Sequence, residues 1–252
     1  MEILLYILIF LFGTIIGSFL NVVIHRVPKK ESIVYPPSHC PSCGHELNAV
    51  DLIPILSYIL LKGRCRYCGE KISIRYPIVE LLTGIVFLII YYKFGLDFKA
   101  FSYMFLASIL IAVSFIDIEH RIVPNKIILV GFIGGIIFRV LMYNYGFIDY
   151  IMGLVLGGGI LLLISLISGG EMGGGDIKLM ALIGFFIGWK LTILVLFLSV
   201  IIGALGGVIL VALKIKGRKD YIPFAPYISI AWLISILYGY EMLNYYIKFI
   251  RG

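Results

Sequence analysis

The sequence has few charged side chains: Asp, Glu, Lys and Arg together make up only 14% of its 252 residues. A soluble domain of ordinary composition carries about 25%. Hydrophobic residues make up 61%, so the composition excludes an ordinary soluble domain and indicates a chain that crosses a membrane several times. The net charge of +7 predicts no nucleic-acid partner, because Lys and Arg collect in the cytoplasmic loops of membrane proteins, next to the lipid.

The first apolar run also lacks the marks of a cleaved signal peptide. Glu2 is the only charge before it, so there is no basic leading region. The run covers residues 3–24 and exceeds the roughly 7–15 apolar residues of a signal peptide. We interpret it as a first helix that the protein keeps.

Eight apolar segments predict an all-α polytopic membrane protein with about eight transmembrane helices. They cover residues 3–24, 76–92, 100–116, 127–143, 148–168, 177–189, 191–213 and 224–240. We expect helices because lipid offers no hydrogen-bond partners to backbone N–H and C=O groups, and a helix pairs these groups with one another. Most segments reach the roughly 17–25 residues of a spanning helix, while the sixth is short and could be tilted, partly buried or re-entrant.

Basic residues predict how the chain is oriented in the membrane. Eight lie between the first and second segments: Arg26, Lys29, Lys30, Lys62, Arg64, Arg66, Lys71 and Arg75. Four more lie between the seventh and eighth: Lys214, Lys216, Arg218 and Lys219. Because positive loops stay in the cytoplasm, we expect the N-terminus outside and both of these loops inside.

One stretch, residues 26–76, is polar and contains all four cysteines. Cys40 and Cys43 form one C-x-x-C pair, Cys65 and Cys68 form a second, and a glycine follows each pair. Four thiolates in two such pairs are typical of a closed structural Zn²⁺ site. Two disulfides or free thiols are the alternatives, and disulfides are disfavoured in a reducing cytoplasm. We therefore predict a small cytoplasmic zinc module after the first helix, with His39 and His45 outside its ligand set.

Two aspartates stand where apolar segments meet the predicted cytoplasmic face. Asp117 ends the third segment, and Asp176 begins the sixth after Gly173, Gly174 and Gly175. Ionisable groups at membrane depth are costly and so are functional candidates. Two carboxyl groups that share a proton can activate water and protonate a scissile carbonyl. The glycines are expected to allow positive φ or close approach to a substrate strand.

Each of these residues also has a purely structural interpretation. Asp176 could be the N-cap of its helix. The glycines could hold a phosphate, but Lys178 is not followed by Ser or Thr as that motif requires. Glu80 and Asn21 could make structural hydrogen bonds or contact a substrate. Arg139 is expected to extend its charged end away from the apolar core.

These motifs, taken in order, resemble the bacterial prepilin peptidases, also called type IV leader peptidases. The resemblance rests on five blocks spread over nearly the whole chain: residues 17–28, the two cysteine pairs, residues 75–81, residues 173–178 and residues 222–226. In that family a Gly-x-Gly-Asp signature carries the second catalytic aspartate. The resemblance implies that Asp117 and Asp176 are the catalytic pair of an aspartic-type membrane endopeptidase.

The resemblance also implies the substrates and the division of labour. The family removes the short basic leader of type IV pilin-like precursors at the cytoplasmic face of the inner membrane. It then methylates the new N-terminus with S-adenosylmethionine. This implies a methyltransferase part at residues 1–92 and a peptidase part at residues 97–252. The alternatives are a non-enzymatic zinc-stabilised assembly factor and a small ion-coupled transporter. The sequence shows none of the internal repeats that are typical of transporters.

Overall fold

A computed structural model describes residues 2–142, 146–170, 173–215, 217 and 222–251. Within these ranges the regular structure is helical, apart from two isolated bridges that pair His39 with Glu46 and Arg64 with Lys71. The expected all-α architecture is thus confirmed. Tyr143, the expected end of the fourth segment, and the basic residues Lys216, Arg218 and Lys219 lie outside the described residues.

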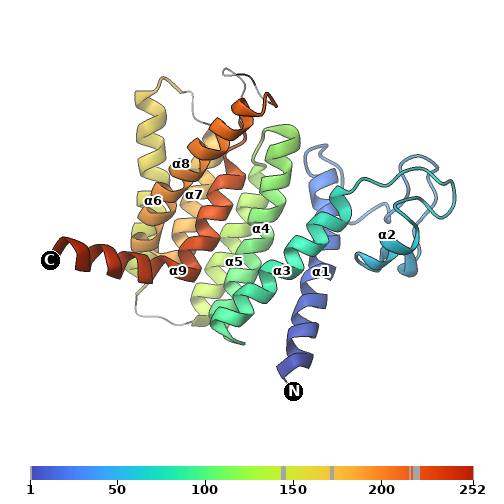
Figure 1. Cartoon of the computed structure of the whole chain (residues 1–252), viewed down its shortest axis with the longest axis horizontal. Coiled ribbons are helices and arrows are strands. Elements are labelled where there is room, and N and C mark those ends of the chain that lie inside the picture. Colours follow the sequence, from blue (N-terminus) through green and yellow to red (C-terminus); the bar gives the residue numbers. More distant parts are fainter. Residues whose placement is uncertain (1, 143–145, 171–172, 216, 218–221, 252) are drawn as a thin grey trace. The chain divides into compact units, whose positions relative to one another are not determined.

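The helices follow one another along the chain as Figure 1 labels them. They are α1 (Glu2–Arg26), the 3-10 helix η1 (Ala49–Leu52), α2 (Leu56–Leu60), α3 (Arg75–Phe94), α4 (Phe98–His120), α5 (Asn125–Met142), α6 (Phe147–Ile167), α7 (Gly174–Ile187), α8 (Trp189–Ala212) and α9 (Ala225–Arg251).

Six of these helices are long and apolar enough to cross a membrane: α1, α3, α4, α5, α6 and α8. Their outer faces are apolar too, and α5 exposes Leu129, Ile133, Ile137 and Val140. The sixth and eighth expected segments form α7 and α9. With 14 residues, α7 is about 21 Å long, shorter than the roughly 30 Å hydrocarbon core. The expectation of a short sixth segment is confirmed.

The chain divides into two compact units, Met1–Ala112 and Val113–Gly252. In the first unit, α1 and α3 pack against each other (Figure 1), and glycines lie at their contact. A Cβ on Gly13 would lie 2.8 Å from Cα of Gly84, and one on Gly17 would lie 2.7 Å from Cα of Glu80. Two glycines four residues apart let the two backbones approach closely. Because Gly13 meets Gly84 and Gly17 meets Glu80, the two helices run antiparallel.

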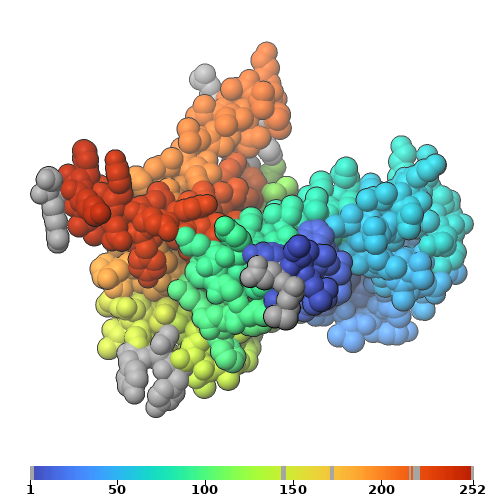
Figure 2. Space-filling view, turned by 60° about the horizontal axis from the view of Figure 1, so that its bottom comes forward, coloured from blue at the N-terminus to red at the C-terminus, as the bar shows by residue number. Residues whose placement is uncertain are grey.

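The polar segment between α1 and α3 contains only the short η1 and α2. Figure 2 shows its light-blue residues as a lobe beside the dark-blue α1. We call residues 27–74 the cysteine module. Arg26, the last residue of α1, holds its start by donating to the carbonyl oxygens of Ser32 at 3.0 Å and Pro37 at 3.2 Å. These hydrogen bonds from a side chain to the backbone order a segment that has little apolar core of its own.

In the second unit, α7 lies at the centre and packs against α5, α6, α8 and α9. A Cβ on Gly153 of α6 or on Gly184 of α7 would clash with the carbonyl oxygen of the other glycine. The last residues of α7, from Leu182 to Ile187, are all buried. The short helix is therefore shielded by protein and need not span the lipid alone. Gly188, with φ of +78°, ends α7 and turns the chain into α8 in a conformation that favours glycine.

Candidate functional site

Asp117 lies near the end of α4 and is 1% exposed. Its Oδ2 accepts a hydrogen bond from the backbone N–H of Ala225 at 3.1 Å, and the backbone of Phe224 also hydrogen-bonds to this carboxylate. Ala225 is the first residue of α9. The first N–H groups of a helix have no partner inside the helix and carry the positive end of its dipole. The start of α9 therefore holds the Asp117 carboxylate and favours its charged form.

Asp176 lies in the first turn of α7 and is 4% exposed. The N-cap of α7 is Gly173, which makes no side-chain cap hydrogen bond. The N-cap interpretation of Asp176 is therefore wrong. Its Oδ1 is buried and has no hydrogen-bond partner among the described residues. The charge of Asp117 acts on this carboxyl group, so the second unit brings the two aspartates within electrostatic range of each other.

The glycines before Asp176 do not have the positive φ that was expected of them, while their approach to a substrate strand stays a prediction. None of Gly173, Gly174 and Gly175 has a positive φ; that conformation occurs earlier, at Gly169 and Gly170. A Cβ on Gly175 would lie 2.6 Å from Cβ of Val123. The close approach is thus to the chain's own turn between α4 and α5, so Gly175 positions the start of α7 against the turn that follows Asp117.

A second contact fixes the same junction. The Nζ of Lys178 donates to Oδ1 of Asn125, the first residue of α5, at 2.9 Å. Arg121, the residue just after α4, has φ of +57°. Its backbone N–H donates to the carbonyl oxygen of Asp117 at 2.9 Å. Lys178 thus joins the first part of α7 to the start of α5, and the Arg121 hydrogen bond closes the last turn of α4.

The guanidinium of Arg139 does not extend away from the apolar core as expected. It donates to the carbonyl oxygen of Phe186 and lies 3.2 Å from the centre of the Tyr150 ring. Phe186 is in the last turn of α7, where carbonyl groups lack partners inside the helix and a positive charge is favourable. Arg139 therefore caps α7 at the end opposite Asp176.

The four cysteines come together in the cysteine module. The sulfur atoms of Cys40, Cys43, Cys65 and Cys68 all lie within 4.8 Å of one another, and all four are free thiols. The Sγ atoms of Cys40 and Cys68 are 3.8 Å apart. A tetrahedral zinc with Zn–S bonds of about 2.3 Å places its sulfurs about 3.8 Å apart, so the cluster fits this ion. His39 and His45 are not part of it.

The two cysteine pairs have the same backbone geometry. In each pair the N–H of the glycine donates to the carbonyl oxygen of the first cysteine, at 2.8 Å for Gly44 and 3.0 Å for Gly69. Both glycines have positive φ, +70° and +74°, which explains why glycine follows each pair. Burial raises the pKa of Cys40, but hydrogen bonds from the backbone of Cys43 and Ser42 outweigh it and lower the pKa to about 7.

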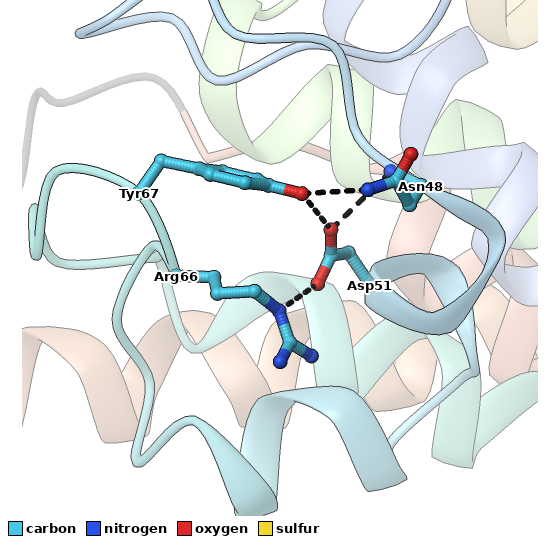
Figure 3. Close-up of polar contacts among 4 residues, drawn as sticks. All are labelled: Asn48, Asp51, Arg66 and Tyr67. Atoms are coloured by element: carbon cyan, nitrogen blue, oxygen red, sulfur yellow. Dashed lines mark hydrogen bonds and ion pairs between the residues drawn. The ribbon is translucent and has the colours of Figure 1, made fainter.

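A polar network that the sequence did not reveal joins the second cysteine pair to η1 (Figure 3). Asp51 accepts from Nε of Arg66 at 2.6 Å and from the hydroxyl of Tyr67 at 3.0 Å. Asn48 donates to the same hydroxyl at 2.8 Å. The hydrogen bond from Arg66 lowers the pKa of Asp51, so this link is present at neutral pH. Arg66 and Tyr67 stand between Cys65 and Cys68. Their place inside a cysteine pair is the only sequence signal that could have marked them as structurally important.

Comparison with known proteins adds a decisive observation. Residues 11–94 match the bacterial peptidase A24 N-terminal domain, and residues 104–208 match the type IV leader peptidase family. A prepilin leader peptidase/N-methyltransferase of Bacillus subtilis (strain 168) is 36% identical and aligns over 97% of this chain and 99% of its own. The chain belongs to the type IV leader peptidase family.

Other relatives in the type IV leader peptidase family carry the same name. A prepilin leader peptidase/N-methyltransferase of Aeromonas salmonicida (strain A449) is 34% identical over 96% of this chain and 93% of its own. One of Pseudomonas aeruginosa is 34% identical over 95% of this chain and 92% of its own. Near full-length similarity to named enzymes disfavours the assembly-factor and transporter alternatives. No solved structure matches the chain.

Proposed function

We propose that the chain removes the leader of type IV pilin-like precursors by aspartic-type peptide hydrolysis and then methylates the new N-terminus. The observation that carries the peptidase half is the arrangement of Asp117 and Asp176. Both are buried in the second unit, one bound by the start of α9 and one with an oxygen that has no partner among the described residues. Membership of the family supplies the expected chemistry.

The two surroundings assign different tasks to the two carboxyl groups. Asp117 accepts backbone hydrogen bonds at a helix N-terminus, which stabilises its anion. Asp176 is buried beside that negative charge, and two carboxylates at close range do not both ionise readily. Asp117 therefore takes a proton from the attacking water, while Asp176 holds a proton for the carbonyl oxygen of the scissile bond. Its Oδ1, which has no partner among the described residues, is the atom available for this contact.

The topology proposed from the basic residues places this chemistry at the cytoplasmic face of the inner membrane, with the N-terminus outside. Asp117 lies near the end of α4 and Asp176 at the start of α7, so both fall at the same predicted face. A precursor with an apolar helix in the bilayer and a basic leader in the cytoplasm has its junction at that depth. The scissile bond is then near both carboxyl groups.

The cysteine module would hold Zn²⁺ through Cys40, Cys43, Cys65 and Cys68. Four thiolates leave the ion no open position, so it would supply structural closure and no catalysis. S-adenosylmethionine, the methyl donor implied by the family, would supply an electrophilic methyl group. The first unit, which contains the module, is where we place methyl transfer.

A single experiment tests both halves. The detergent-solubilised protein is incubated with a pilin-like precursor and S-adenosylmethionine, and the product masses are measured. We expect loss of the leader together with a gain of about 14 mass units, the difference between hydrogen and methyl. Cleavage without this gain would refute the methyltransferase half, and an intact precursor would refute the peptidase half.

A further inference from the structure

Glu80 on α3, in the first unit, is 7% exposed. It has no part in the two proposed reactions as described above. Its Oε2 accepts the backbone N–H of Ile55 at 2.7 Å, and the hydroxyl of Ser18 also hydrogen-bonds to the carboxylate. A carboxylate can accept about four hydrogen bonds, so it has acceptor capacity left. Among the described residues no cation pairs with it. A buried anion without a cation is costly, and a cationic ligand would relieve that cost.

A buried amide oxygen that has no donor among the described residues lies nearby, on α1. Asn21 is 2% exposed. Its amide Nδ2 donates to the carbonyl oxygen of Tyr76 at 3.0 Å, but its Oδ1 has no partner among the described residues. Tyr76 precedes Glu80 by one turn of α3. The hydrogen bond therefore holds Asn21 beside α3, one turn before Glu80.

The packing of α1 on α3 makes these two side chains converge. Gly17 touches the backbone of Glu80, and Asn21 follows Gly17 by one turn on the same face of α1. Side chains on a helix lean toward its N-terminus. Because α1 and α3 run antiparallel, Asn21 leans toward the level of Glu80, and Glu80 leans toward the level of Asn21. Gly17 has no side chain of its own at this crossing, where a Cβ would lie 2.7 Å from Cα of Glu80.

The cysteine module reaches this place through Ile55. Ile55 has φ of +64°, a conformation that is strained for a β-branched residue. Such strain persists where surrounding contacts impose it and is concentrated at functional sites. Here the contact is the hydrogen bond from Ile55 N–H to Glu80, so the module is held directly at the buried carboxylate.

We propose that Glu80 and Asn21 bind the α-amine of the cleaved substrate and that Glu80 accepts its proton before methyl transfer. This inference rests on the methyltransferase half of the proposed function. A primary ammonium has one positive charge and three N–H donors. These match a carboxylate that pairs with no cation and an amide oxygen that accepts no hydrogen bond among the described residues. Glu80 lies five residues after Arg75, the first residue of α3, and therefore about 8 Å along the helix. The N-terminus of a membrane-anchored product can reach this depth.

The chemistry balances with the groups named. The ammonium gives one proton to the Glu80 carboxylate and becomes a neutral amine with a free electron pair. That pair forms the new C–N bond to the methyl carbon of the sulfonium donor, and the electrons of the C–S bond remain on sulfur as a thioether. The product is a secondary ammonium, and Glu80 returns its proton to solvent.

The test compares Glu80→Gln with the matched exposed variant Glu31→Gln in the full-length protein. Glutamine keeps the size of the side chain and an oxygen for Ile55 N–H, but it loses the charge and the proton acceptor. We expect Glu80→Gln to cleave precursor at nearly the wild-type rate. Its methylation of a pre-cleaved peptide should fall about 10²-fold or more, as for loss of a general base. Glu31→Gln should resemble wild type in both assays.

The Michaelis constants separate the amine from the other candidate cation, the methyl donor, which has an α-ammonium and a sulfonium of its own. For Glu80→Gln and for Asn21→Leu, the KM for the pre-cleaved peptide should rise while the KM for S-adenosylmethionine stays unchanged. A rise in the donor's KM instead would assign the site to the donor and overturn the proposal. Loss of cleavage in Glu80→Gln, in parallel with methylation, would mean that Glu80 only holds the fold.

A binding measurement gives a readout independent of activity. The Asp176→Asn protein should bind a pre-cleaved peptide with a free amine more tightly than the same peptide acetylated at that amine. Adding Glu80→Gln should remove this preference, and a preference that survives would overturn the proposal. Failure of the wild-type protein to methylate would refute the proposed function separately, while the binding preference would still decide whether this is an amine site.

Discussion

At the scale of single residues, the proposed mechanism requires the two aspartates to act as a pair. We expect Asp117→Asn and Asp176→Asn each to reduce cleavage roughly 10³-fold or more, because each removes one of the two proton-transfer groups. The double variant should be no worse than either single variant. Asp149→Asn, an exposed carboxyl group on α6, is the matched control. Product mass measures cleavage, and clear cleavage by either single variant would exclude a shared-proton mechanism.

Two neighbouring glycines provide a sharper test of geometry. A Cβ on Gly174 meets nothing within 4 Å, whereas one on Gly175 lies 2.6 Å from Cβ of Val123. Both are in the first turn of α7 and neither has a positive φ. Gly174→Ala should therefore cleave at nearly the wild-type rate.

Gly175→Ala should lose at least about tenfold in cleavage rate, because Asp176 must move with the displaced backbone and small misplacements are costly. Initial cleavage rates at equal amounts of inserted protein measure the effect. Equal rates for the two alanine variants would show that contact with Val123 does not position Asp176.

Sequence patterns predicted some of these residues and not their partners. Asp117, Asp176 and the cysteines stand in local motifs, so their identities could be predicted. The bond from Ala225 to Asp117 joins residues 108 positions apart, and the bond from Ile55 to Glu80 joins residues 25 apart. No local spacing encodes such contacts. The positive φ expected at residues 173–175 was wrong, while close approach to a substrate strand stays a prediction. The contact of Gly175 with Val123 could not be predicted, because Val123 lies 52 positions earlier.

At the scale of elements, the cysteine module should depend on metal. We expect one Zn²⁺ per chain by elemental analysis of the purified protein. A strong chelator should make Cys40, Cys43, Cys65 and Cys68 reactive to thiol reagents and the module sensitive to proteases, while the helices keep their circular dichroism. Backbone amides at residues 27–74 should then exchange faster with solvent. A metal-free protein with four freely titrating thiols would contradict this prediction.

Helix lengths were predictable where lipid sets them and less so elsewhere. The expected segments 76–92 and 148–168 agree closely with α3 and α6, because an apolar run must match the bilayer. By contrast, α9 continues to Arg251, well beyond the expected end at 240. Its last part carries Glu241 and Lys248, so apolarity could not mark its end. The network around Asp51 was hidden for a similar reason, because it depends on how a loop folds back.

At the scale of the whole molecule, the two proposed activities should separate. The cysteine module belongs to the first unit and both aspartates to the second. Cys40→Ser should release the leader but methylate the product poorly. Asp176→Asn should do neither with intact precursor, because the amine is never exposed, but it should methylate a pre-cleaved peptide.

Incorporation of labelled methyl into the pre-cleaved peptide decides this prediction. Wild-type protein is the positive control. Ser102→Ala controls for a buried change in the first unit, because it removes a hydroxyl that donates to the carbonyl oxygen of Lys99 in its own helix. If Asp176→Asn fails to incorporate methyl where wild type succeeds, the two activities share a site or a folding requirement.

The contact between Gly153 and Gly184 also has a mechanical consequence. The backbones of α6 and α7 touch there, so any side chain added at either glycine must push α7 aside. Gly184 follows Asp176 by about two helical turns, and a short helix moves as a rigid rod. The contact therefore fixes the position of α7 against α6, and with it the position of Asp176 in the first turn of α7. If Asp176 is a catalytic residue as proposed, its alignment is set partly at a point that no substrate needs to reach. Natural variation at Gly153 or Gly184 should then change the catalytic rate.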